Sequence, residues 1–143
     1  MLRRNSGLIA LVLAVALGFG LHAQTAADLA LQGSWVVVGA EHDGQPMTAL
    51  NGGIMTVTNT RFEIHTACGN LLRGELRLDP KKTPAQMDFL HDDGRHWEAI
   101  YEVNGDDFKI NYVAAGGKDQ RPASFSTSPD TEASLVILKR KND

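Results

Sequence analysis

Apolar and polar side chains alternate with a period of two along most of the chain, and turn residues interrupt the pattern at short intervals. In one such segment, Phe62 and Ile64 share a face while Glu63 and His65 occupy the other. One polar and one apolar face is typical of an antiparallel sheet packed on one side against a core. We therefore predict eight strands, over residues 34–43, 53–59, 61–67, 70–79, 85–91, 95–103, 106–113 and 134–141.

The connections between these segments agree with hairpins. Asn104-Gly105 predicts a two-residue turn, because both residues accept a positive φ. Residues 92–94 predict a slightly longer hairpin, and the proline-containing stretch 79–84 predicts a loop. The one long connection is 114–133, which is rich in Gly, Pro, Ser and charged residues.

Eight short strands joined mostly by hairpins favour an all-β, antiparallel up-and-down barrel, because closure removes the exposed edges of an open sheet. A two-sheet sandwich is the structural alternative. Residues 24–32 predict a short N-terminal helical turn with Asp28 as its cap. The interior of such a barrel is either filled by side chains or holds one small ligand.

The N-terminal segment has the features of a secretory signal peptide. Arg3 and Arg4 precede an uncharged apolar run over 8–21, and the small residue Ala23 follows it. The run is shorter than the ~20 residues that span a membrane. We expect residues 1–23 to be removed on export to the periplasm or the extracellular space, which leaves 24–143 as one domain without a membrane anchor. An uncleaved anchor, or cleavage a few residues later, is the alternative.

Composition restricts the partners. The 143 residues include 14 Lys and Arg against 17 Asp and Glu, for a net charge of −3, and they contain no basic block. Nucleic acid is therefore not an expected partner. Cys68 is the single cysteine, so no intramolecular disulfide forms; we expect a buried or inert thiol, with a reactive or dimer-forming thiol as the alternative. We expect a monomer.

A family resemblance enters with Gly33-Ser34-Trp35, which opens the first predicted strand. Gly-x-Trp at this place is similar to the lipocalin signature. In that superfamily the Trp closes one end of the barrel beneath a basic side chain from the last strand, and Arg140, with Lys139 as the alternative, matches the basic residue here.

Longer stretches extend the likeness over residues 29–141. They are LQGSWVVV from Leu31, GELRLDPKKTP from Gly74, IYEVNGDDFKI from Ile100, Arg121-Pro122, and LVILKR from Leu135. Together they resemble a bacterial lipocalin-like domain family of unknown function, first described in planctomycete proteins and often exported. The resemblance implies a barrel and supplies no catalytic residue.

Catalytic and metal chemistry have little support. His91, Asp93 and His96 could offer metal ligands, but Arg95 lies among them, and a hydrated hairpin tip accounts for the same residues. The serines of the 114–133 connection have no neighbouring histidine to act as a base. We expect no enzyme activity, no metal and no cofactor.

The apolar interior is the remaining candidate site. Small residues on the inward faces, at Gly39, Gly74 and Ala99, could leave room for a ligand. Arg121 could meet an anionic group at the rim, although we favour a role in tying down the long loop. The candidate ligand-binding residues are Phe62, Phe89, Trp97, Tyr101, Phe108, Tyr112 and Arg121.

The function that we expect depends on whether the barrel interior is open or filled. A cavity above about 300 Å³, open at one end, favours binding of a small apolar molecule. A filled barrel with an exposed apolar patch favours a protein-interaction or inhibitor module of the cell envelope. A structural envelope protein without any ligand is the third hypothesis.

Overall fold

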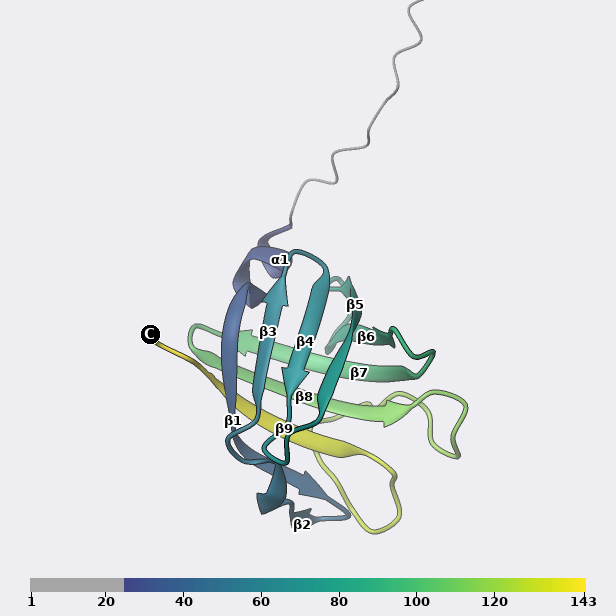
Figure 1. Cartoon of the computed structure of the whole chain (residues 1–143). Coiled ribbons are helices and arrows are strands. Elements are labelled where there is room, and N and C mark those ends of the chain that lie inside the picture. The colour runs from purple at the N-terminus through teal and green to yellow at the C-terminus, as the bar shows by residue number, and fades with distance from the viewer. Residues whose placement is uncertain (1–24) are drawn as a thin grey trace, which may run out of the picture.

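The computed structural model describes residues 25–143, which form a closed antiparallel barrel of eight strands with one short α-helix (Figure 1). The eight barrel strands pair in chain order, and the first, β1 (Gly33–His42), also pairs with the last, β9 (Ser134–Arg140), to close the barrel. The elements in chain order are α1 (Ala26–Leu31), β1 (Gly33–His42), β2 (Gln45–Pro46), the 3₁₀ helix η1 (Thr48–Leu50), β3 (Ile54–Thr58), β4 (Arg61–His65), β5 (Leu71–Asp79), β6 (Ala85–His91), β7 (His96–Asn104), β8 (Asp107–Ala114) and β9 (Ser134–Arg140).

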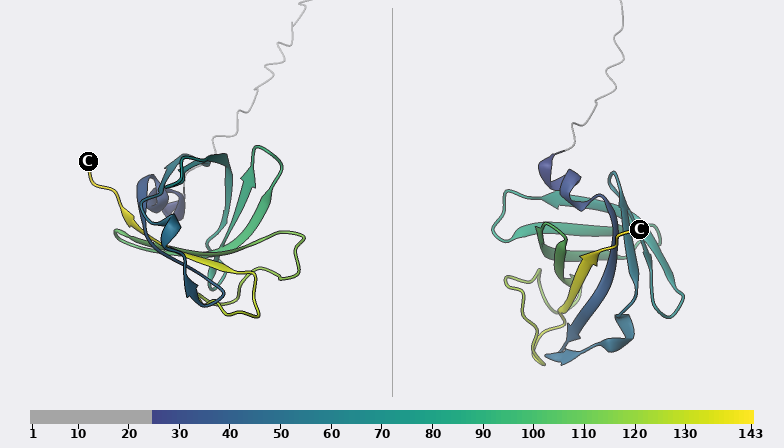
Figure 2. Two further views of the ribbon diagram at one scale, coloured as in Figure 1. Left: turned by 60° about the horizontal axis from the view of Figure 1, so that its bottom comes forward. Right: turned by 90° about the vertical axis from the view of Figure 1, so that its left-hand side faces the viewer.

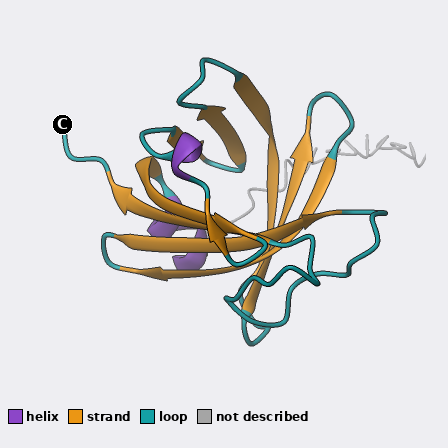
Figure 3. Ribbon diagram, turned by 90° about the horizontal axis from the view of Figure 1, so that it is seen from below, coloured by secondary structure: helices purple, strands orange, loops and turns teal. Residues whose placement is uncertain are grey.

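This architecture confirms the predicted up-and-down barrel and excludes the two-sheet sandwich. All eight predicted strands are present, each with ends within two residues of the prediction. The two-residue strand β2, which pairs only with β1, and the helix η1 were not predicted. Both lie at the end of the barrel opposite α1, which Figure 3 views from below.

The predicted turn at Asn104-Gly105 is wrong by one residue. Asn104 pairs with Asp107, so the two loop residues are Gly105 and Asp106. Gly105 has φ 60°, whereas Asp106 does not have a positive φ. A turn in which only the first central residue needs a positive φ is a type II′ turn, which Gly at this place favours.

A β-bulge in β1 shifts which residues face the interior. The pairing with β9 slips between Val37 and Gly39, and Val38 is exposed. Beyond the slip, Ala40 pairs with Val136 on the inward face, and Gly39 lies against Ile137 on the outer face. The expectation that Gly39 leaves room inside the barrel is therefore wrong, because one extra residue reverses the alternation.

The helix α1 covers one end of the barrel (Figure 2). Its N-cap is Thr25, whose side chain accepts a hydrogen bond from the Asp28 backbone while the Asp28 carboxylate accepts from the Thr25 backbone. Asp28 is thus the third residue of a capping box, which corrects its prediction as the cap. Neither helix in residues 25–143 is long and apolar enough to cross a membrane.

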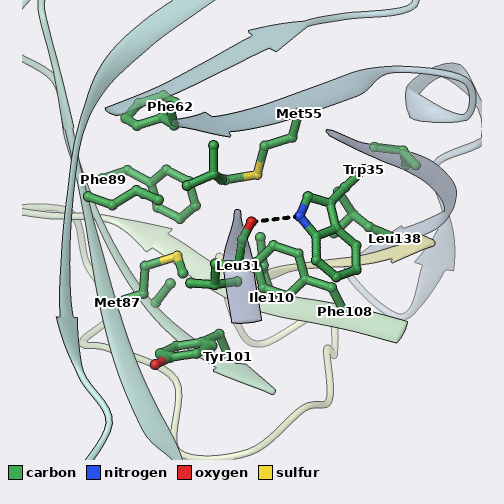
Figure 4. Packing of buried hydrophobic residues seen from close by; sticks show 14 residues of the cluster. Leu31, Trp35, Met55, Phe62, Met87, Phe89, Tyr101, Phe108, Ile110 and Leu138 are labelled. Carbon is green, nitrogen blue, oxygen red and sulfur yellow. Dashed lines mark hydrogen bonds between the residues drawn. The ribbon is translucent and has the colours of Figure 1, made fainter. Parts of the chain in front are cut away.

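The closed end beneath α1 is tightly packed. Leu31 of α1 contributes a buried side chain, and its carbonyl accepts a hydrogen bond of 2.9 Å from Trp35 Nε1 (Figure 4). The Trp35 ring meets the Phe108 ring edge-on at 5.1 Å between centroids. These contacts fill the closed end, so open space inside the barrel lies toward the other end.

The long connection after β8 covers part of the outer barrel wall. Ile100, Asn111 and Val113 alternate with inward-facing residues and therefore point outward, yet all three are buried. The Asn111 amide donates hydrogen bonds to the backbone carbonyls of Ser124 and Ser126, at 2.8 and 3.0 Å. The connection therefore forms a second, smaller core on the outside of β7 and β8.

Candidate ligand cavity

An apolar cavity of about 100 Å³ lies inside the barrel at the end opposite α1. Its lining comes from every strand of the barrel and from η1, so it is the unfilled part of the barrel interior. The lining residues are Val37, Leu50, Gly53, Met55, Ile64, Thr66, Leu72, Phe89, Trp97, Ile110, Tyr112, Val136 and Leu138.

One wall of the cavity is aromatic. Trp97 and Tyr112 stack with ring centroids 4.5 Å apart, and Phe89 lies 5.8 Å from Trp97. Burial raises the pKa of Tyr112, and a side-chain hydrogen bond with Ser134 opposes that shift. Three of the predicted lining residues, Phe89, Trp97 and Tyr112, therefore do line the cavity.

Three other predicted aromatic residues fill the core instead. Phe108 packs against Trp35 at the closed end, and Phe62 lies edge-on to Phe89 at 5.1 Å. Tyr101 is buried near α1, where burial and then the charges of Asp28 and Asp79 raise its pKa. Alternation placed these side chains inside correctly but did not show which of them border the cavity. Tyr101 instead borders a separate pocket of about 300 Å³ beside Ala27 and Ala30 of α1.

Arg121 lies on the outer side of the barrel and not at the cavity, which corrects its place among the lining residues. Its Nη1 donates to the backbone carbonyls of Met87 and Ala99, at 3.0 and 2.7 Å, and these two residues are partners on β6 and β7. Its Nη2 donates to the Asp88 carboxylate at 2.6 Å. Arg121 thus ties the long connection to two strands, the role favoured for it above.

His91 is a buried polar residue, so the expectation that it belongs to a hydrated hairpin tip is wrong. Only 6% of it is exposed, and neither ring nitrogen has a hydrogen-bond partner within residues 25–143. Its ring lies 4.2 Å from Trp97 and 5.2 Å from Phe62, between centroids. Burial, and then the charge of Arg95, lowers its pKa. Its alternation with Met87 and Phe89 in β6 was the available signal for an inward position.

A pair of polar side chains, His42 and Ser134, lies next to Tyr112 and was not predicted from the sequence. Ser134 Oγ lies 2.9 Å from His42 Nδ1, which also lies 3.2 Å from the Ala133 carbonyl oxygen. A carbonyl oxygen only accepts, so this contact requires a proton on Nδ1. A nitrogen that carries a proton cannot take one from Ser134, so the pair does not have the geometry of an activated nucleophile. The pair instead holds Ser134 against Tyr112.

The histidines near 91–96 do not converge. His91 points into the barrel, whereas His96 lies 3.5 Å from Asp88 on the outer face. The Asp93 carboxylate bonds to Arg95, which lowers the pKa of Asp93 to about 2. Within the described part of the chain, no three His, Cys, Asp or Glu side chains are grouped to hold a metal ion.

Cys68 is exposed, in the turn between β4 and β5, so of the two states expected for its thiol, buried or inert, the buried one is wrong. The hydrogen bond between its Sγ and the Thr66 hydroxyl, 3.3 Å long, is the main cause of a lowered thiol pKa. The sequence places no Lys or Arg close to Cys68, and the group that lowers its pKa is instead the hydroxyl of Thr66, two residues away.

The arrangement predicted from Gly33-Ser34-Trp35, a basic side chain of the last strand over the Trp ring, is present at the closed end. The Arg140 guanidinium lies over the Trp35 ring, and Gly33 has φ 109°, a conformation that favours glycine. No protein-family model and no curated protein sequence that was searched matches the chain. The lipocalin-like family resemblance therefore stays a prediction, and the structure supports the barrel architecture alone.

Proposed function

We propose that this protein is exported and binds a small, mostly apolar molecule inside its barrel. The observation that carries the proposal is the cavity at the open end, whose lining residues are apolar apart from Thr66 and the single polar groups of Trp97 and Tyr112. Open apolar space inside an otherwise packed domain has a cost in stability, which a bound apolar molecule offsets.

The volume of the cavity restricts the ligand. At about 100 Å³ it does not reach the volume of about 300 Å³ that was expected of a binding cavity, so that expectation is wrong. An engineered apolar cavity of about 150 Å³ accepts benzene. The proposed ligand is therefore a compact molecule whose buried apolar part is no larger than one benzene ring, and a long lipid chain would not fit without rearrangement of the lining.

The alternative, a protein-interaction module, has weaker support. The 114–133 connection, the longest loop that such a module could use to dock, is bonded to its own barrel through Asn111 and Arg121. The large exposed apolar side chains are Leu29, Val38 and Leu71, which belong to α1, β1 and β5. Scattered apolar side chains of this kind are normal on protein surfaces.

Titration calorimetry of the full chain with toluene tests the binding proposal. Val136→Phe places a ring in the cavity, whereas Ile137→Phe adds the same ring to the outer face of the same strand. We expect the unchanged protein and the Ile137→Phe variant to bind toluene, and Val136→Phe to bind at least tenfold more weakly. Equal toluene affinity in both variants, or no binding to the unchanged protein, would contradict the proposal.

The proposed export has its own test. The full chain is expressed in a Gram-negative host, the cells are fractionated, and the intact mass of the protein is measured. We expect a periplasmic or extracellular protein that begins near Gln24. A cytoplasmic protein that retains Met1–Ala23 would contradict export and would leave the binding proposal standing.

A further inference from the structure

The end of the barrel where the cavity opens carries an excess of negative charge. Four connections lie there, and together with the adjoining strand ends they span 41–53, 63–73, 91–96 and 114–133. They contain eight acidic and four basic residues, a net charge of −4. The acidic residues are Glu41, Asp43, Glu63, Asp92, Asp93, Asp119, Asp130 and Glu132.

The basic side chains at this end are mostly engaged with carboxylates. Arg73 lies 3.3 Å from Glu63, and Arg95 lies 2.7 Å from Asp93. Arg61, which lies outside these segments, is 2.6 Å from Asp92 and offsets one of the eight acidic charges. Arg121 pairs with Asp88 at 2.6 Å on the outer face of the barrel. The cavity lining itself includes no Lys or Arg. An anionic group on a ligand would therefore meet repulsion at the mouth and no cationic partner inside.

We infer that the cavity selects neutral or cationic molecules and rejects carboxylic acids of the same shape. This inference rests on the proposed function and names the chemical class of its ligand. Charge of one sign around a low-dielectric opening raises the local concentration of oppositely charged molecules and lowers that of like-charged ones. Because these charges are near solvent, salt weakens the effect, with a screening length of about 10 Å at 0.1 M.

Three probes that share one apolar ring separate charge from shape: benzylammonium, benzyl alcohol and benzoate. Calorimetric titration of the full chain is made in 10 mM and in 500 mM salt. At low salt we expect benzylammonium to bind most tightly and benzoate most weakly, with about three- to tenfold between them. At high salt the two affinities should converge, while that of benzyl alcohol stays nearly constant.

Matched charge variants locate the effect. Asp43→Asn and Asp130→Asn remove two charges at the open end, where a Cβ atom added at Gly44 would lie 3.9 Å from the Pro129 ring. Asp43 has φ 53°, which Asn tolerates. Asp79→Asn and Asp143→Asn remove two charges elsewhere as the control. We expect the preference for benzylammonium over benzoate to shrink in the first double variant and to persist in the control.

The outcomes are distinguishable. Equal affinity for the three probes, or tightest binding of benzoate, would overturn this inference and leave the binding proposal intact. Absence of binding by any probe would overturn both. The same loss of preference in the two double variants would overturn the assignment of selectivity to the mouth, because net charge alone would then account for it.

Discussion

The Arg140 guanidinium lies 4.2 Å above the centre of the Trp35 ring and connects three parts of the closed end. It donates hydrogen bonds to the backbone carbonyls of Ala30 and Gln32, at 3.0 and 2.9 Å, and it pairs with Asp106 at 3.1 Å. One side chain from the last strand thus holds the end of α1, the first strand and the β7–β8 turn together.

Loss of this contact should destabilise the whole domain. We expect Trp35→Ala to lower the free energy of unfolding by about 3–5 kcal/mol, because the ring is fully buried. Arg140→Ala should cost about 2–3 kcal/mol, through lost hydrogen bonds and the lost cation–π contact. Lys139→Ala, at the exposed neighbouring position, is the control. Urea denaturation measures all three, and a near-neutral Trp35→Ala would contradict the packing argument.

Arg121→Ala should release the long connection from the barrel. The guanidinium bonds two backbone carbonyls and the Asp88 carboxylate, and bonds to charged groups contribute about 1.5–3 kcal/mol each at most. We expect amide hydrogen exchange in 115–133 to accelerate at least tenfold, with β1 to β4 little changed. Arg77→Ala, at an exposed position of β5, is the control. Unchanged exchange in the connection would show that Arg121 does not anchor it.

His91 should make stability depend on pH. Because burial lowers its pKa in the folded protein below the ordinary 6.5, the unfolded chain binds the proton first as pH falls. Stability therefore falls as pH drops below about 6.5, and it levels off only below the folded pKa. The His91→Leu substitution removes both unpartnered ring nitrogens. It should therefore make stability depend less on pH and should raise stability at pH 5.

The pH experiment has a direct control in His65→Leu, since His65 is exposed and bonds to Glu63. Thermal unfolding of the three proteins is followed between pH 5 and pH 8. An unchanged slope in His91→Leu would mean that other groups cause the dependence.

Gly74→Ala should be strongly destabilising. A Cβ atom at this position would lie 2.1 Å from the Leu90 carbonyl oxygen and 2.7 Å from the Phe62 ring. Such overlap forces the backbones of β5 and β6 apart, and we expect a loss of about 3 kcal/mol. Gly39→Ala is the matched control, because its Cβ would meet Ile137 at an ordinary 3.8 Å. Similar urea midpoints for the two variants would contradict the close approach at Gly74.

Local sequence patterns determined the strands and most turns of this protein. Alternation at Phe62 and Ile64 and the loop prolines each act within a few residues, so they indicate structure without knowledge of the rest of the chain. The barrel itself followed from the order of these elements, because eight hairpin-linked strands avoid open edges by closing. The turn at Gly105 was also predicted from neighbouring residues alone, and its position was wrong by only one residue.

Only the tertiary structure decided what those elements enclose. The bulge at Val38 reversed the inward face of β1, and packing between distant strands left Phe89, Trp97 and Tyr112 beside open space while Phe108 and Tyr101 fill the core. The outward position of Arg121 depends on how a long connection folds back over β6 and β7. Volumes and contacts of this kind are set by residues far apart in the sequence, so no local pattern encodes them.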